Sequence, residues 1–443
     1  MGFDRAFHAA ATYASPPSLD DFRRRIDPAW IESALAATGT ATVRRRRLPA
    51  EQVIWLVLGM ALFRDRTIED VVSKLDLALP AAGRTIAKSS ISQARERLGS
   101  EPVKWIFERS AQAWATRSAD AQRWRGLSLY GIDGTSVRVP DSAENRATFG
   151  GQRSRHGSES GYPSLRLVAL MALRSHLLLA CNIVGYGVTG ERRAADPLAA
   201  SIPPRSLTVV DRGFFAATFL LDIEAGEGRQ WLTRARTTLA ARVVQQYARG
   251  DELIELDVSP QARKLRPDLP FTWQMRAIKY QVEGYEEQTL LTSLRDPKRY
   301  PAAEIVALYH ERWELELGYD EIKTELLDRE EAIRSRKPDG VLQEMWGILL
   351  AYNLVRLEME SIAKDAAIEP TRISFVESLR LIRDEWEWLS VTSPGAIPKR
   401  LETMRRSLKR YVLPPRRRRR FPRVVKIKMS NYLRKRPIAE RTK

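Results

Sequence analysis

The 443-residue sequence predicts an α/β protein with a mixed sheet at its centre and further segments around it. Strand-like and helical patterns alternate over residues 121–230, which is typical of a mixed α/β core. Strand-like segments then follow one another over 231–303, and Lys and Arg accumulate near the C-terminus. The expected parts are a helical N-terminal domain, the first part of the core, an all-β insertion, a helical second part of the core and a basic C-terminal tail. Their expected boundaries are 1–120, 121–230, 231–303, 304–390 and 391–443.

The N-terminal part carries signals for short capped helices. Pro49 precedes an apolar helix over 50–63, and Thr67 is expected to cap a second helix. Ser89 or Ser90 should cap a third helix, which Gly99 ends. The third helix carries four side chains that can bind phosphates or read bases: Ser92, Gln93, Arg95 and Arg97. With the basic run at 44–47 this pattern favours a small DNA-binding domain, and a plain helical scaffold is an alternative of almost equal weight.

The core should begin with three strands, then a helix, a strand and a second helix. The expected strands are 128–139, 165–173, 177–188 and 206–211. The long segment 141–164 is rich in Gly and Ser and should form an exposed loop. Helices are expected to resume at Ala302 and to continue to about residue 390. Because no Gly-rich loop of the Walker A type occurs, nucleotide hydrolysis is not supported.

Cysteine and histidine are too scarce for most metal centres. Cys181 is the single cysteine, so a disulfide framework and a Cys-rich zinc site are excluded. None of the four histidines lies at metal-ligand spacing from another. A metal centre would therefore need carboxylate ligands, which suit Mg²⁺ or Mn²⁺.

The chain is expected to be soluble and intracellular. Its longest apolar run, residues 53–63, is shorter than the roughly 20 residues that a membrane-spanning helix needs. The N-terminus lacks the basic-then-apolar order of a secretory signal.

Almost all of the net charge of +18 lies near the C-terminus. Residues 399–443 contain 19 Lys or Arg and two Glu, which leaves +17 for this segment and about +1 for the rest. A dense basic tail indicates a polyanionic partner, and nucleic acid is favoured over a solvated tail that binds nothing. The signal carries no information on DNA sequence.

Two aspartates follow apolar strand-like runs. Asp133 comes after LSLYGI, and Asp211 comes after LTVV. Sites in α/β sheets form beyond the carboxyl ends of strands, so the two acids are candidates for one site. An Asp-Gly pair is also an ordinary turn signal, and on this evidence the two interpretations are about equal.

The segment 309–326 has six carboxylates, and helical spacing separates them. At about 100° per residue, one stripe contains Tyr309, Arg312, Glu316, Asp320 and Lys323. An adjacent apolar stripe should pack on the sheet, and the remaining acids, Glu311, Glu314, Glu321 and Glu325, should face water. The simplest alternative is a helix with two surface ion pairs, Arg312–Glu316 and Asp320–Lys323.

The same segment resembles the third motif of DDE transposases of the insertion-sequence-4 family. That motif is Tyr-x2-Arg-x3-Glu-x6-Lys, and Tyr309, Arg312, Glu316 and Lys323 match every position and spacer. GIDGT at 131–135 resembles the first motif, and VVDRGFF at 209–215 resembles the second. The resemblance covers roughly residues 20–435.

This resemblance implies a ribonuclease-H-like core in which Asp133, Asp211 and Glu316 are catalytic and bind two divalent ions, Mg²⁺ or Mn²⁺ as a substitute. It implies that Tyr309, Arg312 and Lys323 contact DNA near the cleaved end. Arg212 and the loop residues Arg153 and Arg155 are further candidates for DNA contacts. An aromatic residue that holds an extruded base is also implied, with Trp273 as a candidate, although a core Trp is the stronger interpretation.

The implied function is cut-and-paste transposition. The enzyme would bind the terminal inverted repeats of its own element, hydrolyse a phosphodiester there and join the 3′-OH ends to target DNA. The expected partners are double-stranded DNA and a second subunit in a homodimer. No membrane association is expected, and the protein should lie in the bacterial cytoplasm, associated with the nucleoid. The alternatives are another nuclease or integrase of the same fold and a non-catalytic DNA-binding regulator.

Overall fold

The computed structural model describes residues 25–40, 48–75, 86–153, 159–236, 240–281, 286–327, 333–389 and 397–414. Within these ranges no helix is both long and apolar enough to cross a membrane. The basic run at 44–47 and residues 415–443 of the tail lie outside the described residues.

The N-terminal part is helical, as expected. Its helices are α3 (Pro28–Ala37), α4 (Ala50–Leu62), α5 (Ile68–Lys74), α6 (Lys88–Leu98) and α7 (Glu101–Ala121). The Thr67 side chain accepts a hydrogen bond from the Asp70 N–H at 3.1 Å, and Gly99 ends α6 with a φ of 68°. The expected cap at Ser89 or Ser90 is wrong, because α6 already begins at Lys88 and has no side-chain cap.

A nine-stranded sheet forms the centre of the molecule, in the order β5-β4-β1-β6-β7-β11-β10-β9-β8. Its first five strands are β1 (Ser128–Arg138), β4 (Ser164–Ala172), β5 (Leu178–Gly185), β6 (Ser206–Val210) and β7 (Gln230–Arg234). β1 pairs antiparallel with β4 and parallel with β6, and β6 pairs parallel with β7. The predicted strands of the core are therefore confirmed.

Between these strands lie α8 (Ala143–Phe149), the two-residue strands β2 (Gln152–Arg153) and β3 (Glu159–Ser160), and α9 (Glu191–Ala195) with the 3₁₀ turn η2 (Asp196–Ser201). The 3₁₀ turn η3 (Arg212–Phe214) and α10 (Ala217–Glu224) follow β6. The long segment 141–164 is thus partly helical and not a plain loop.

The strand-rich segment extends this same sheet. It consists of β8 (Arg242–Ala248), β9 (Asp251–Asp257), β10 (Thr272–Tyr280) and β11 (Gln288–Thr292), and β11 pairs with β7. The expectation of an all-β insertion is wrong in one respect, because α11 (Pro260–Leu265) lies between β9 and β10. Its N-cap Ser259 and the following Pro260 are helix-start signals that explain this turn.

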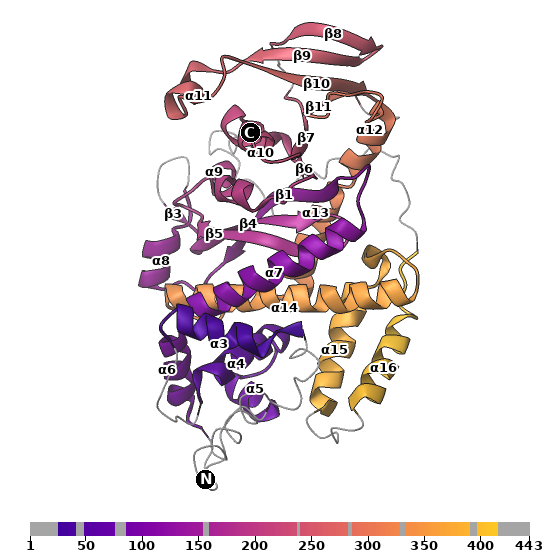
Figure 1. Cartoon of the computed structure of the whole chain (residues 1–443). Helices are drawn as coiled ribbons and strands as arrows, with labels where there is room; N and C mark the ends of the chain where they lie inside the picture. Colours follow the sequence, from indigo (N-terminus) through magenta and orange to yellow (C-terminus); the bar gives the residue numbers. More distant parts are fainter. Residues whose placement is uncertain are drawn as a thin grey trace, which may run out of the picture.

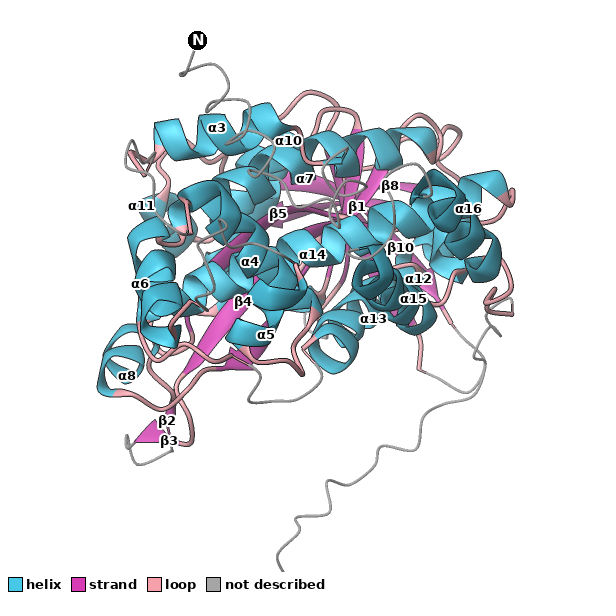
Figure 2. Ribbon diagram, turned by 90° about the horizontal axis from the view of Figure 1, so that it is seen from below, coloured by secondary structure: helices cyan, strands magenta, loops and turns pink. Residues whose placement is uncertain are grey.

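The longest helix, α14 (Pro338–Asp365), connects the N-terminal helices with the sheet. In Figure 1 it runs horizontally below the sheet and above α3, α4 and α6, and Figure 2 shows it from the side of these helices. Its centre is apolar on all sides, so most of its residues are buried. The 3₁₀ turn η5 (Pro370–Arg372), α15 (Phe375–Leu389) and α16 (Ile397–Leu408) follow it.

Glu344 of α14 holds the N-terminal helices to this helix. Its carboxylate accepts hydrogen bonds from Arg64 at 3.2 Å and from Arg95 at 3.4 Å, and all three side chains are almost completely buried. Burial alone would raise the pKa of Glu344, but Arg95 and Arg64 outweigh it and lower this pKa. Arg95, a candidate for reading bases, is therefore a structural residue.

The segment 302–326 is not one continuous helix. α12 (Ala302–His310) ends at a turn, α13 (Trp313–Asp320) follows it, and a π-helical turn, η4 (Glu321–Leu326), completes the segment. The expected apolar stripe is confirmed, since Leu308, Leu315, Tyr319, Ile322 and Leu326 are all buried. The single stripe from Tyr309 to Lys323 is wrong, because the turn and the π-helix interrupt the 100° spacing.

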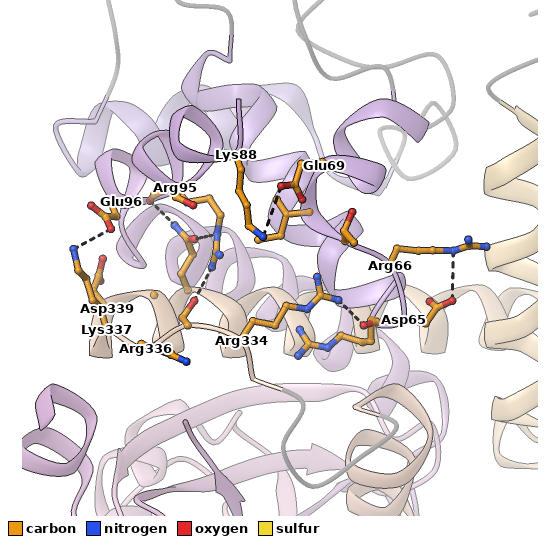
Figure 3. A pocket seen from close by; sticks show the side chains of 17 residues that line it. Asp65, Arg66, Glu69, Lys88, Arg95, Glu96, Arg334, Arg336, Lys337 and Asp339 are labelled. Carbon is orange, nitrogen blue, oxygen red and sulfur yellow. Dashed lines mark hydrogen bonds and ion pairs between the residues drawn. The ribbon is translucent and has the colours of Figure 1, made fainter. Parts of the chain in front are cut away.

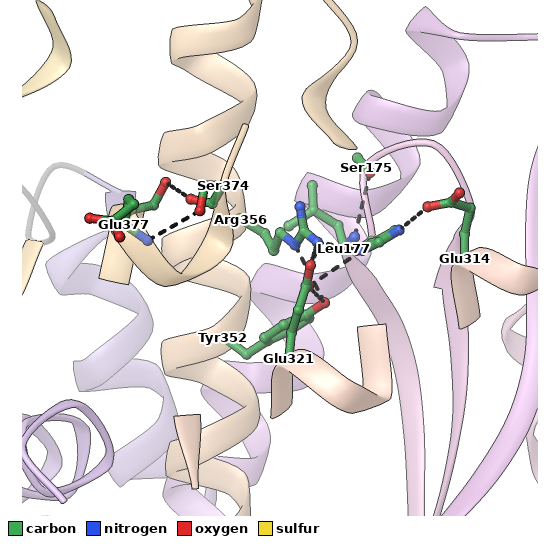
Figure 4. A network of polar contacts seen from close by, with 10 residues as sticks. Ser175, Leu177, Glu314, Glu321, Tyr352, Arg356, Ser374 and Glu377 are labelled. Atoms are coloured by element: carbon green, nitrogen blue, oxygen red, sulfur yellow. Dashed lines mark hydrogen bonds and ion pairs between the residues drawn. The ribbon is translucent and has the colours of Figure 1, made fainter. Parts of the chain in front are cut away.

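Three acids that were expected to face water bind partners at the β4–β5 turn and α14. Glu311 accepts two hydrogen bonds from Arg174, at 2.8 and 3.0 Å. Glu314 lies 2.7 Å from Nε2 of the fully buried His176. Glu321 binds the Arg356 guanidinium and the Tyr352 hydroxyl, as Figure 4 shows. The prediction failed because helical spacing cannot reveal a second packed surface.

The network around Glu321 should make the fold sensitive to acid. Burial alone would raise the pKa of Glu321, but Arg356 and His176 lower it from 4.5 to about 2. A depressed pKa stabilises the folded state fully above pH 4.5, and this contribution is lost as the pH falls toward 2.

We therefore expect Glu321→Gln to destabilise the protein at pH 7 by about 3 kcal/mol, because Arg356 stays buried without its counter-ion. Urea unfolding at several pH values measures the effect. Between pH 4.5 and 2, the free energy of unfolding of this variant should fall less than that of the wild type. The control Glu325→Gln, in the same π-helical turn, should behave as the wild type. Equal unfolding midpoints for the two variants would contradict this role of Glu321.

Candidate active site

Asp133 and Asp211 lie side by side on two neighbouring parallel strands. The parallel pairing of β1 with β6 ends at Ile132 and Val210, and each aspartate is the next residue in the chain. Side chains at matched positions of parallel strands point to the same face of the sheet. Asp211 ends its strand as predicted. Asp133 does not, because β1 continues to Arg138 in its pairing with β4.

The Asp133 carboxyl group lies in a crowded acidic environment. Its pKa is raised from 3.8 to about 6, mainly by burial and further by the negative charges of Glu191 and Asp211, while Gly134 N–H and Arg312 act in the opposite direction. Glu191, at the start of α9, was not recognised in the sequence. A Cβ at position 134 would lie 2.3 Å from its Oε1, so the glycine after Asp133 makes room for this fourth carboxylate.

Glu316 lies on α13, above the sheet, and Arg312 connects it with Asp133. The Arg312 guanidinium donates a hydrogen bond to Glu316 at 2.8 Å and lies 3.8 Å from the Asp133 carboxylate. The Arg312–Glu316 ion pair, which was the simplest alternative for this segment, is therefore present, and a contact of Arg312 with DNA stays a prediction. The Glu316 side chain is 41% exposed, so packing does not lock its rotamer.

A tyrosine hydroxyl joins α13 to the backbone of Asp133. The Tyr319 hydroxyl donates to the Asp133 carbonyl and accepts from the Ala169 N–H at 3.1 Å, and these two residues are paired across β1 and β4. Gly131 allows the close approach, since a Cβ there would lie 2.8 Å from Leu315 of α13. These contacts therefore fix the position of α13 along β1, next to Asp133.

The expected DNA-binding residues differ in their access to solvent. Arg212, directly after Asp211, and Lys323, in the π-helical turn, are exposed. Tyr309 is only 8% exposed, and its burial raises the pKa of its hydroxyl to about 12. Little of the Tyr309 side chain is accessible to DNA in this structure, and its DNA contact stays a prediction.

Two further expectations concern the loop and the insertion. Arg153 belongs to β2, and Arg155 lies outside the described residues. Trp273 is 5% exposed, stacks on Phe215 with a centroid distance of 6.0 Å and donates a hydrogen bond to Glu224 at 3.2 Å. Trp273 is therefore a core residue in this structure.

The chemistry of the side chains fits divalent metal ions, and their arrangement fits in part. Asp133, Asp211 and Glu316 offer the oxygen ligands that Mg²⁺ prefers. Within the described part of the chain, however, no three Asp, Glu, His or Cys side chains stand close enough to hold an ion together. Arg312 supplies positive charge between Asp133 and Glu316.

Family models match most of the chain. A model described as insertion element 4 transposase N-terminal matches residues 16–108, and one described as transposase DDE domain matches residues 124–354. The second range contains Asp133, Asp211 and Glu316.

Curated relatives agree with these matches. The chain is 38% identical to the Escherichia coli K12 transposase InsG for insertion sequence element IS4, over 94% of this chain and 93% of that protein. It is 36% identical to the putative transposase InsZ of the same strain, over 52% of this chain and 76% of that protein. A solved piggyBac transposase synaptic complex with hairpin DNA is 10% identical, with a TM-score of 0.45 over 90% of this chain and 86% of that chain, and this weak likeness adds nothing to the assignment. With a conserved-domain match over half its length and a relative matched almost from end to end, the chain belongs to the insertion-element-4 family of DDE transposases.

Proposed function

We propose that the protein cuts the ends of its own insertion element and joins the freed 3′-OH ends to target DNA. The observation that carries this proposal is that Asp133 and Asp211 directly follow the last paired residues of two parallel strands. Tyr319 joins the helix of Glu316 to the Asp133 backbone, and Arg312 binds Glu316 and lies close to the Asp133 carboxylate. The order of the first five strands, β5-β4-β1-β6-β7, with β4 antiparallel to β1, supports a ribonuclease-H-like core. Two ends must be processed together, which favours a homodimer.

A DDE transposase domain implies that divalent metal ions are used. In the proposed site Asp133, Asp211 and Glu316 would hold two of them, Mg²⁺ or Mn²⁺, which would activate the attacking oxygen and stabilise the leaving 3′-oxygen. Exchange of one phosphodiester for another is nearly isoenergetic, so the reaction needs no nucleotide-binding site.

Arg312 has a second task in this proposal. In the DNA-free protein it reduces the repulsion between the acids by binding Glu316 and approaching Asp133. A DNA phosphate can replace a carboxylate as the acceptor, because a guanidinium binds both groups through matching pairs of donors and acceptors. Movement of Arg312 toward the phosphate would release Glu316 for its role in the site. The exposed Lys323 and Arg212 would bind neighbouring phosphates.

The three carboxylates can be tested with isosteric changes. Asp133→Asn, Asp211→Asn and Glu316→Gln should each abolish Mg²⁺-dependent cleavage of element-end DNA and leave DNA binding largely intact, because charge is lost without loss of volume. Gel analysis of cleaved ends and fluorescence anisotropy measure the two properties.

The matched control is Asp320→Asn, since Asp320 is exposed on the same helix as Glu316 and accepts a hydrogen bond from Thr324 at 2.8 Å. This variant should cut normally. Loss of cleavage in Asp320→Asn with normal cleavage in Glu316→Gln would show that the wrong acid was assigned.

Tyr319→Phe tests whether the hydroxyl positions the site. The variant leaves the Asp133 carbonyl and the Ala169 N–H without this partner, so we expect a loss of about 1–2 kcal/mol in stability. Because α13 is no longer aligned with β1, the Mg²⁺ concentration for half-maximal cleavage should rise several-fold with little change in DNA affinity.

Thr292→Val provides a control with the same kind of lost contact. The buried Thr292 hydroxyl donates to the Trp231 carbonyl at 2.6 Å and accepts from the Leu294 N–H at 3.2 Å, in strands β7 and β11. It should lower stability and leave the Mg²⁺ requirement unchanged. If the Mg²⁺ concentration for half-maximal cleavage rose equally in both variants, Tyr319 would have a structural role only.

Truncation after Pro414 tests the basic tail. This position preserves the contacts between Arg372 and Leu413 and removes thirteen Lys or Arg and one Glu. Binding to DNA of any sequence should weaken, and the dependence of log affinity on log salt should become several units less steep. If the slope of log affinity against log salt stayed unchanged, the tail would have no role in DNA binding.

A further inference from the structure

A cleft of about 780 Å³ lies between α5, α6 and the segment that leads into α14, away from the three carboxylates. Figure 3 shows Lys88 and Glu69 on the side of the N-terminal helices and Arg334–Lys337 on the opposite side. The lining contains seven Lys or Arg and four Asp or Glu, so its formal charge is +3. The cleft therefore attracts anions.

Hydrogen bonds of Arg95 connect the elements of the inner wall of the cleft. Arg95 donates hydrogen bonds to Gln343 at 2.9 Å and to Ser335 at 3.1 Å, besides its contact with Glu344. These buried contacts hold α6 against the beginning of α14. The two walls therefore keep a fixed spacing, which reduces the entropy lost when a ligand binds.

The rim carries positive charges that a ligand can take over. The side chains of Lys88 and Lys337 are 76% and 64% exposed, and Arg336 is also exposed. Lys88 lies 3.8 Å from Glu69, and Lys337 lies 2.9 Å from Glu96. Exposed ion pairs of this kind contribute little to stability, so a phosphate can replace the carboxylate at little cost.

We propose that this cleft binds the sugar-phosphate backbone of one DNA strand through Lys88, Arg336 and Lys337, an inference that rests on the proposed action on DNA. The DNA backbone is favoured over base edges because the rim offers exposed cations on long side chains. Arg95 could bind a base, but its guanidinium already binds Gln343 and Glu344. The cleft takes cations from both the N-terminal part and the segment after η4. DNA bound there would contact the N-terminal helices and the segment that leads into α14 at once.

The test uses full-length protein and a fluorescein-labelled duplex of random sequence, titrated at several salt concentrations. Lys88→Ala combined with Lys337→Ala should weaken binding and make the slope of log affinity against log salt about two units less steep, one for each lost phosphate contact. Glu96→Gln should strengthen binding, because Lys337 then loses the carboxylate that accepts its hydrogen bond. A folding defect would weaken DNA binding, so it cannot explain stronger binding by the Glu96→Gln variant.

The matched control combines Lys364→Ala, at the far end of α14, with Arg380→Ala on α15. Both residues are exposed, and Arg380 has an ion pair with Glu377 at 2.9 Å, as Lys337 has with Glu96. Equal slopes for the two double variants, or no gain in Glu96→Gln, would overturn the cleft as a DNA-binding site. Wild-type protein that binds the duplex through the cleft but never cuts element ends would instead contradict the proposed function.

Discussion

The position of Glu316 depends on charges that are buried beneath its helix. His176, fully buried in the β4–β5 turn, lies between Glu314 and Glu321, and Arg356 of α14 binds Glu321 from the other side. Burial of such charges requires desolvation and adds little net stability when all partners are present. The network instead specifies one arrangement, because any shift of α13 or η4 would leave a buried charge without its counter-ion.

This constraint matters because the three proposed catalytic acids come from distant parts of the chain. Asp133 and Asp211 are brought together by the parallel pairing of β1 with β6, which needs no helix. The helix that carries Glu316 is placed near them only by packing of α13 on the sheet. The Tyr319 hydroxyl refines this packing, since it binds the backbone of Asp133 itself. The polar network sets the helix on the sheet, and the tyrosine sets its register.

The charge balance of the site explains the presence of Arg312. The raised pKa of Asp133 reflects its burial together with repulsion from the nearby acids Glu191 and Asp211. A guanidinium between Asp133 and Glu316 relieves it in the protein alone. Metal ions and DNA phosphates would change this balance together. An ion-pair partner and a DNA ligand are therefore successive roles of one side chain in the proposed mechanism.

The sequence by itself determined the strands of the core, most of the N-terminal helices and the family, because these rest on local periodicity, capping residues and the spacing of Tyr309, Arg312, Glu316 and Lys323. Only the tertiary structure decided which acids face water. Glu311, Glu314 and Glu321 pack against residues more than thirty positions away, and the turn at 311–312 and the π-helical turn interrupt the regular spacing. Glu191 and the hydroxyl contact of Tyr319 were equally hidden, since neither follows a local pattern. Long-range packing places these side chains, and a periodicity that spans one helix contains no information about its partners.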